Sequence, residues 1–269
     1  MRNEADIWDH VEVHRDDLTG LADRVWGTPE TLYGEYKSCA EHTAMLRAKG
    51  FAVTENVAGI PTAVMGEAGS GGPVIAILGE YDALPGLSQV AGIAEPRELT
   101  PGGPGHGCGH NLLGSAALLA ACALKDWLAA TGTPGRVRYY GCPAEEGGAA
   151  KTFMVRDGAF DDVDAAITWH PDCMTRVDDP VSLANTRMDF TFHGRSSHAA
   201  ASPHLGRSAL DAVELMSVGV NYLREHSVQD ARIHYAYLDA GGFAPNVVQA
   251  KAKVRYSIRA LQLAEMLAL

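Results

Sequence analysis

The stretch Pro73-Val-Ile-Ala-Ile-Leu78, closed by Gly79, decides the fold that we expect for this chain. A continuous apolar run that ends at a glycine is typical of a strand buried on both faces. Residues 137–142 and 165–169 have a similar apolar character, and a long apolar helix is predicted over residues 111–130. Strands that alternate with helices predict an α/β fold, with a mainly parallel sheet flanked by helices.

The segments on either side of this region extend the prediction. Apolar positions recur with helical spacing over residues 6–50, where Gly50 is the expected end of the helical region. After Asp179-Pro180 the pattern changes to strand, helix, strand and strand, followed by the start of a helix. The corresponding ranges are 183–192, 208–223, 233–238, 247–258 and 262–269. This order predicts a ferredoxin-like α+β unit that lacks its last strand. We therefore expect one domain over residues 1–181 and a second over 182–269.

Composition restricts the class of protein. Of 269 residues 46% are hydrophobic, and the net charge is −11, from 22 basic and 33 acidic side chains. An acidic chain repels a phosphate backbone, so a nucleic-acid partner is not expected. Five scattered cysteines are not a disulfide framework, residues 1–11 do not resemble a signal peptide, and the apolar run 112–124 is too short to span a membrane. These features predict a cytoplasmic protein with no membrane partner.

The segment Gly105-His-Gly-Cys-Gly-His-Asn111 offers a first pair of candidate metal ligands. Cys108 and His110 are two positions apart, so their side chains point the same way on an extended backbone. Thiolate and imidazole together suit Zn²⁺ and similar ions. The alternatives are a flexible loop in which both residues occur by chance, or a redox cysteine, although no Cys-x-x-Cys pair is present.

Candidate catalytic or metal-binding residues also follow two further strands. Glu145 and Glu146 are adjacent after the second strand, so one carboxylate can bind a metal while the other faces a substrate. His170 follows the third strand. Taken singly, the two glutamates are more often a solvated turn and such a histidine is more often an ordinary core or loop residue. A parallel sheet would bring all three junctions to one edge, however, which favours a shared metal site for hydrolysis.

The order of these motifs resembles the M20 metallopeptidase family, and within it the aminoacylase and amidohydrolase branch. The matching motifs are Gly79-Glu-Tyr-Asp-Ala-Leu-Pro85, His106-Gly-Cys-Gly-His-Asn111, Glu145-Glu146-Gly-Gly and His170-Pro171, within a likeness from about residue 5 to 260. The resemblance implies a zinc-peptidase-like catalytic domain into which a lid and dimerisation domain is inserted. It also implies two divalent metal ions, Zn²⁺ or Mn²⁺, and a homodimer or a homologous partner subunit.

The resemblance also implies roles for individual residues. Cys108, His110, Glu146 and His170 match metal ligands, Glu145 matches the general base that acts on a metal-bridging water, and Asp82 matches an acid that supports the ligands. In the second domain, His198 matches a histidine that polarises the scissile carbonyl across the dimer, and Asn246 and Arg259 match residues that hold the substrate carboxylate. The implied reaction is hydrolysis of the amide bond of N-acyl or N-aroyl amino acids such as p-aminobenzoyl-glutamate.

Two departures from the family pattern leave an alternative open. Asn111 stands where the branch usually has an aspartate, and family members continue beyond residue 269 to a final histidine ligand. The chain is therefore expected to be truncated, and the alternative is a catalytically inactive metal-binding or assembly module. A serine hydrolase is disfavoured, because no Gly-x-Ser-x-Gly motif occurs.

Overall fold

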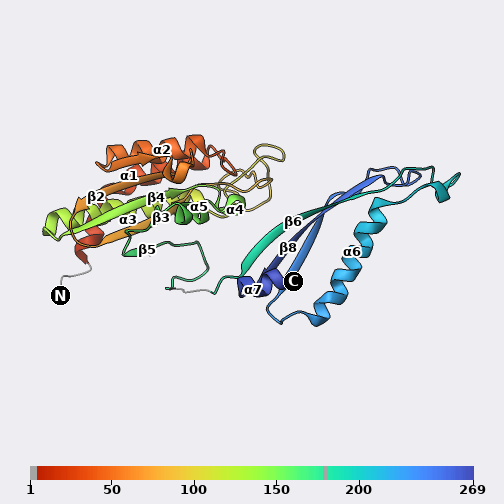
Figure 1. Ribbon diagram of the computed structural model, residues 1–269. Coiled ribbons are helices and arrows are strands. Elements are labelled where there is room, and N and C mark those ends of the chain that lie inside the picture. The colour runs from red at the N-terminus through yellow and green to blue at the C-terminus, as the bar shows by residue number, and fades with distance from the viewer. Residues whose placement is uncertain (1–4, 178–180) are drawn as a thin grey trace. The chain divides into compact units, whose positions relative to one another are not determined.

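The computed structural model describes residues 5–177 and 181–269 (Figure 1). The chain divides into two compact units, Met1–Thr175 and Arg176–Leu269. The expected domain boundary at residues 181 and 182 adjoins the pair Asp179-Pro180, which lies outside the described residues. The exact position of that boundary therefore stays a prediction.

The first unit is built on a five-stranded sheet in the order β1-β2-β4-β3-β5. Its strands are Ala52–Glu55 (β1), Val64–Ser70 (β2), Val74–Glu80 (β3), Gly135–Cys142 (β4) and Ala165–Ile167 (β5). Strand β3 pairs in parallel with both β4 and β5, whereas β2 pairs antiparallel with β1 and β4. The α/β class is confirmed, and the parallel part of the sheet consists of the three strands that the sequence predicted.

Adjacent residues of a strand point to opposite faces of the sheet, so each face has its own apolar side chains. Helices pack against both faces. On one face Tyr139 packs with α1 (Ala5–Trp26), α2 (Tyr36–Ala48) and α3 (His110–Thr131). On the other face Tyr140 packs with the short helix η1 (Val57–Gly59) and with α5 (Ala150–Arg156), while α4 (Glu145–Gly148) is a single turn that follows β4. Both tyrosines are almost completely buried.

The prediction of one helical region over residues 6–50 is wrong at residues 27–35, where α1 has ended and α2 has not begun. Pro29 disfavours helical backbone at the residue before it. Leu32 and Tyr33 then adopt left-handed backbone, with φ angles of 45° and 64°. Gly50, with φ 77°, lies just after α2 as expected.

Helix α3 is the only described helix that is long and apolar enough to cross a membrane by length and composition. Leu113, Leu118 and Cys122 on this helix are completely buried, and Leu118 and Cys122 pack in the same core as Tyr139. In this structure α3 is therefore a core helix of the first unit.

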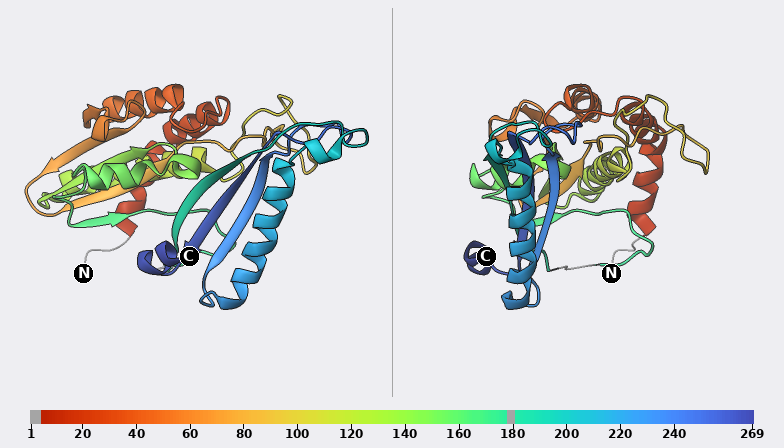
Figure 2. Two further views of the ribbon diagram at one scale, coloured as in Figure 1. Left: turned by 45° about the vertical axis from the view of Figure 1, so that its right-hand side comes forward. Right: turned by 90° about the vertical axis from the view of Figure 1, so that its right-hand side faces the viewer.

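The second unit consists of an antiparallel sheet in the order β6-β8-β7 with α6 along one face (Figure 2). Its elements are Ala184–His193 (β6), Pro203–Leu205 (η2), Ala209–Leu223 (α6), Arg224–His226 (η3), Arg232–Asp239 (β7), Lys251–Ala260 (β8) and Leu263–Ala268 (α7). Val213 of α6 packs against Val254 and Tyr256. The predicted order of strand, helix, strand and strand is present, although β8 begins at Lys251 and not at residue 247, where Val247 pairs instead with His198 in an isolated bridge.

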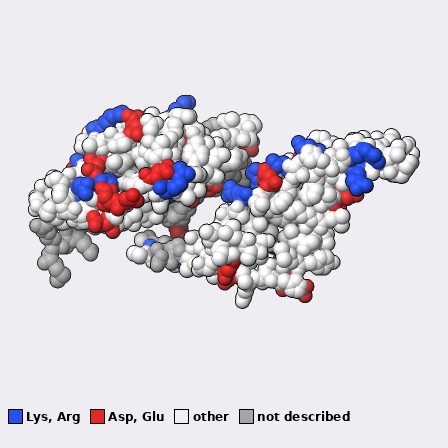
Figure 3. Space-filling view, viewed as in Figure 1, with Lys and Arg blue, Asp and Glu red and all other residues white. Residues whose placement is uncertain are grey.

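Acidic and basic side chains lie next to one another on the visible face of the first unit (Figure 3). Arg138, for example, forms ion pairs with Glu67 and Asp162. On this face, basic and acidic side chains are therefore interleaved.

Candidate metal centre

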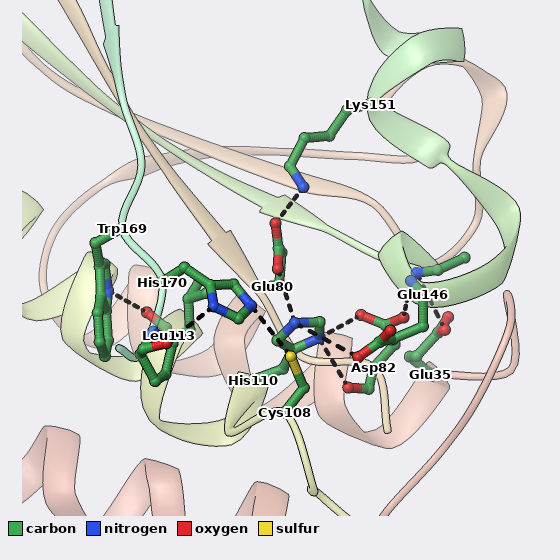
Figure 4. A network of polar contacts seen from close by, with 12 residues as sticks. Glu35, Glu80, Asp82, Cys108, His110, Leu113, Glu146, Lys151, Trp169 and His170 are labelled. Atoms are coloured by element: carbon green, nitrogen blue, oxygen red, sulfur yellow. Dashed lines mark hydrogen bonds and ion pairs between the residues drawn. The ribbon is translucent and has the colours of Figure 1, made fainter. Parts of the chain in front are cut away.

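The ends of the three parallel strands meet at one edge of the first unit's sheet (Figure 4). Glu80 is the last residue of β3, Glu145 begins the turn after β4, and His170 follows β5. His110 is the first residue of α3, and Cys108 lies in the turn just before it. Parallel strands have their carboxyl ends at the same edge, so residues that are distant in the sequence come together there.

Cys108, His110 and His170 form a compact set of soft ligands. The sulfur of Cys108 lies 3.1 Å from Nε2 of His170, and one ligand atom from each of the three residues falls within 4.8 Å of the others. The two imidazole rings are nearly perpendicular, with centroids 6.0 Å apart. The indole nitrogen of the neighbouring Trp169 donates to the carbonyl oxygen of Leu113 at 3.2 Å, which ties the segment that carries His170 to α3.

Asp82 orients two of the predicted ligands. Its Oδ1 lies 2.9 Å from Nδ1 of His110, and its Oδ2 accepts a hydrogen bond from the backbone nitrogen of Glu146 at 3.0 Å. Asp82 is itself 1% exposed. A carboxylate that accepts from Nδ1 leaves Nε2 of the imidazole free to bind a metal ion.

Glu80 is a member of the cluster that the sequence analysis missed. Its Oε2 lies 3.0 Å from Nε2 of His110, while Oε1 accepts from the Lys151 ammonium group. Glu80, His110 and Glu145 form a second set whose ligand atoms lie within 4.8 Å of one another. The spacing of Glu80 and Asp82 was a signal, since residues two apart at the end of a strand point to the same side.

Nε2 of His110 and Oε2 of Glu80 are buried and face each other at 3.0 Å, and the buried Oε1 of Glu146 has no hydrogen-bond partner. Oε1 of Glu146 lies 4.0 Å from Nε2 of His110. Buried polar atoms are nearly always paired, so an unpaired carboxylate oxygen of Glu146 beside the ion pair of His110 and Glu80 fits a site for a cation. The donor set of thiolate, imidazole and carboxylate also suits Zn²⁺ or a similar divalent ion.

The ionisation of the cluster is strongly coupled. Burial lowers the pKa of His110, but the hydrogen bonds and negative charges of Asp82 and Glu80 outweigh it and raise that pKa to about 10. Burial, and then Glu146, raises the pKa of the Cys108 thiol to about 12. Burial, and then the charge of Glu80, raises the pKa of Glu145. The surroundings thus favour positive charge and disfavour additional negative charge.

The second unit holds the other predicted residues. Nδ1 of His198 accepts from the backbone nitrogens of Ala200 and Ala201, and the carbonyl oxygen of Asn246 accepts from Ala199 at 3.0 Å. His198 and Asn246 therefore belong to one loop cluster. Arg259 is exposed on β8 and does not join them in the loops.

The sequence profile of peptidase family M20/M25/M40 matches residues 76–255, which include all the cluster residues described above. The chain belongs to this peptidase family. It is 54% identical to the B subunit of p-aminobenzoyl-glutamate hydrolase from Escherichia coli (strain K12) over 260 residues, covering 97% of this chain and 54% of that protein. It is 31% identical to Xaa-Arg dipeptidase of Mus musculus over 262 residues, covering 93% and 56%. The chain thus spans about half the length of the curated relatives it matches.

Solved structures share the fold. A putative aminohydrolase from methicillin-resistant Staphylococcus aureus matches 98% of this chain and 68% of its own, with a TM-score of 0.70 and 20% identity. The YXEP protein of Bacillus subtilis, described as a dinuclear metal binding peptidase of family M20, matches 96% and 67%, with a TM-score of 0.65 and 20% identity. These similarities support the expected zinc-peptidase-like fold.

Proposed function

We propose that this chain contributes the metal centre of an amidohydrolase that cleaves N-acyl or N-aroyl amino acids such as p-aminobenzoyl-glutamate. The observation that carries the proposal is the convergence of Cys108, His110 and His170, with the unpaired Oε1 of Glu146 4.0 Å from Nε2 of His110. The name of the 54% identical relative supports the substrate class.

In this proposal Cys108, His110, Glu146 and His170 hold two divalent cations, Zn²⁺ or Mn²⁺. When bound, such cations polarise the amide carbonyl and lower the pKa of water. Asp82 keeps His110 and the backbone of Glu146 in place. The raised pKa of Glu145 suits a group that accepts a proton from the attacking water and then donates it to the leaving amine.

The residues of the second unit act on the substrate. In this proposal His198 polarises the scissile carbonyl across a homodimer, and Asn246 and Arg259 bind the free carboxylate of the amino-acid half, with Asn246 supplied together with His198 by the partner chain. Arg259 is exposed on β8, where its guanidinium group can pair with a carboxylate. A homologous A-type subunit is a further proposed partner, since a 30% identical relative is the A subunit of p-aminobenzoyl-glutamate hydrolase from Escherichia coli (strain K12). A cytoplasmic location stays a prediction.

Metal content and turnover, measured together, test the proposal. The purified chain is expected to bind a divalent ion and to release p-aminobenzoate from p-aminobenzoyl-glutamate, and a chelator should abolish this release. A chain that binds the ion and hydrolyses no acyl amino acid, alone or with an A-type subunit, would instead support the metal-binding or assembly module. A chain that binds no divalent ion would contradict both.

A further inference from the structure

The turn that carries Glu145 and Glu146 is held in place by a segment that is far away in the sequence. This turn, residues 144–149, is called here the acidic turn. Both of its ends have left-handed backbone at alanines, with φ 52° at Ala144 and 51° at Ala149. Side chains other than glycine rarely adopt this conformation, so it persists only where surrounding contacts impose it.

Residues 30–35, called here the brace, supply such contacts at both ends of the turn. Oε1 of Glu35 accepts from the backbone nitrogen of Ala144 at 3.2 Å. The hydroxyl of Tyr33 donates to the carbonyl oxygen of Gly148 at 2.7 Å. The ring of Tyr33 lies so close to the turn that a Cβ atom at position 148 would collide with it. The brace therefore fixes the position of the turn as well as its conformation.

The brace is itself held by hydrogen bonds to neighbouring segments. Glu35 is completely buried, and its Oε1 also accepts from the backbone nitrogen of Tyr33 at 3.0 Å. The side chain of Glu30 accepts from the backbone nitrogens of Lys37 and Ser38 at the start of α2. The carbonyl oxygen of Glu30 accepts from the backbone nitrogen of Ala83 at 2.7 Å. One segment thus anchors both the acidic turn and the residue next to Asp82.

We propose that Tyr33 and Glu35 are positioning residues, which hold the acidic turn so that Glu145 and Glu146 face the candidate metal centre. The inference rests on the proposed function, because it requires that centre to bind a metal ion. Neither residue reaches the centre itself, and each acts through the backbone of the turn. Hydrogen bonds that orient metal ligands commonly change metal affinity by about tenfold to a hundredfold when they are removed.

The test is the dissociation constant for Zn²⁺, measured on the 269-residue chain by competition with a chromophoric chelator. Tyr33→Phe removes only the hydroxyl, and we expect it to weaken Zn²⁺ binding about tenfold. Tyr140→Phe is the matched control, because the Tyr140 hydroxyl also donates to a carbonyl oxygen at 2.7 Å, that of Ala159, outside the centre. We expect the control to bind Zn²⁺ as the unmodified chain does.

Two variants of Glu35 separate positioning from folding. Burial, and after it the charge of Asp82, raises the pKa of Glu35, so a neutral side chain of the same shape is a conservative replacement. Glu35→Gln keeps an oxygen acceptor for Ala144 and is expected to retain Zn²⁺ affinity, whereas Glu35→Ala is expected to lose it. Thermal unfolding of each variant confirms that the fold is intact.

The outcomes distinguish this inference from the proposed function. If the unmodified chain binds Zn²⁺ and Tyr33→Phe binds it equally well, or if Tyr140→Phe weakens binding as much as Tyr33→Phe does, the positioning role is overturned while the metal centre stands. If the unmodified chain binds no Zn²⁺, the proposed function fails and this inference fails with it.

Discussion

Asp82 contacts His110 and Glu146 at the same time, with one carboxylate oxygen 2.9 Å from Nδ1 of the imidazole and the other 3.0 Å from the backbone nitrogen of Glu146. A single buried side chain therefore sets the relative position of two proposed ligands that belong to α3 and α4. Because both oxygens are used, an amide at this position can satisfy only one of the two contacts.

Asp82→Asn is accordingly expected to weaken binding of Zn²⁺ by about tenfold to a hundredfold. Asp126→Asn is the matched control, because Asp126 contacts the imidazole of His14 at 2.6 Å, away from the proposed centre. Chelator competition on both variants checks the prediction. Equal affinities for the two variants would show that Asp82 does not support the ligands.

The roles of the adjacent glutamates can be separated by single substitutions. Glu145→Gln is expected to lower amide hydrolysis by about a hundredfold to ten-thousandfold while the metal content is unchanged, as expected for loss of a general base. Glu146→Gln is expected to lose bound metal. The measurements are turnover of p-aminobenzoyl-glutamate and metal analysis of the same samples. Hydrolysis retained in Glu145→Gln would reject Glu145 as the base. Loss of metal from that variant would indicate that Glu145 is a metal ligand.

His42 is expected to make the first unit sensitive to acid. Burial, and then the charge of Arg24, lowers its pKa to about 3, and its Nδ1 is hydrogen-bonded to the Tyr139 hydroxyl at 2.8 Å. In the unfolded chain the pKa is about 6.5, so below that pH the unfolded state binds one more proton than the folded state. Stability contributed by this residue is therefore lost as the pH falls from about 6.5 towards 3.

This loss is expected to be about 2 kcal/mol between pH 7 and pH 5. The free energy of unfolding in urea, followed by tryptophan fluorescence, measures it for the first unit alone, since all four tryptophans, Trp8, Trp26, Trp127 and Trp169, lie there. For His42→Gln, the change in the free energy of unfolding between the two pH values should be smaller by this amount. The same difference in both proteins would mean that folding does not lower the pKa of His42.

Gly114 on α3 allows the helix to approach the end of β3. A Cβ atom there would collide with the carbonyl oxygen of Glu80 and would lie 3.0 Å from Cε1 of His42. Gly114→Ala is therefore expected to destabilise the chain by about 1–3 kcal/mol. Gly219 on α6 has open space, so Gly219→Ala is expected to stabilise it by about 0.5–1 kcal/mol. Calorimetry measures the stability of both variants. A Gly114→Ala protein that is as stable as the unmodified chain would contradict the close contact.

The sequence by itself determined the local elements and the order of the motifs. The apolar run of β3 and the long apolar helix α3 depend on side chains next to one another in the chain, and their patterns predict them. Cys108, His110, Glu145, Glu146 and His170 were identified because each follows a strand or precedes a helix. The break between α1 and α2 was missed although Gly27 and Pro29 are signals for it, whereas the left-handed backbone at Leu32 and Tyr33 has no sequence signal comparable to glycine.

Only the tertiary structure decided which of these groups touch. Cys108 and His170 are 62 positions apart, and they meet because β5 pairs beside β3. The pairing of Glu80 with Lys151, the double contact of Asp82 and the contacts of the brace likewise join segments through the sheet. Periodicity reports how a side chain lies relative to its own strand or helix. The order of strands in a sheet depends on the packing of the whole unit, so it decides which distant groups become neighbours.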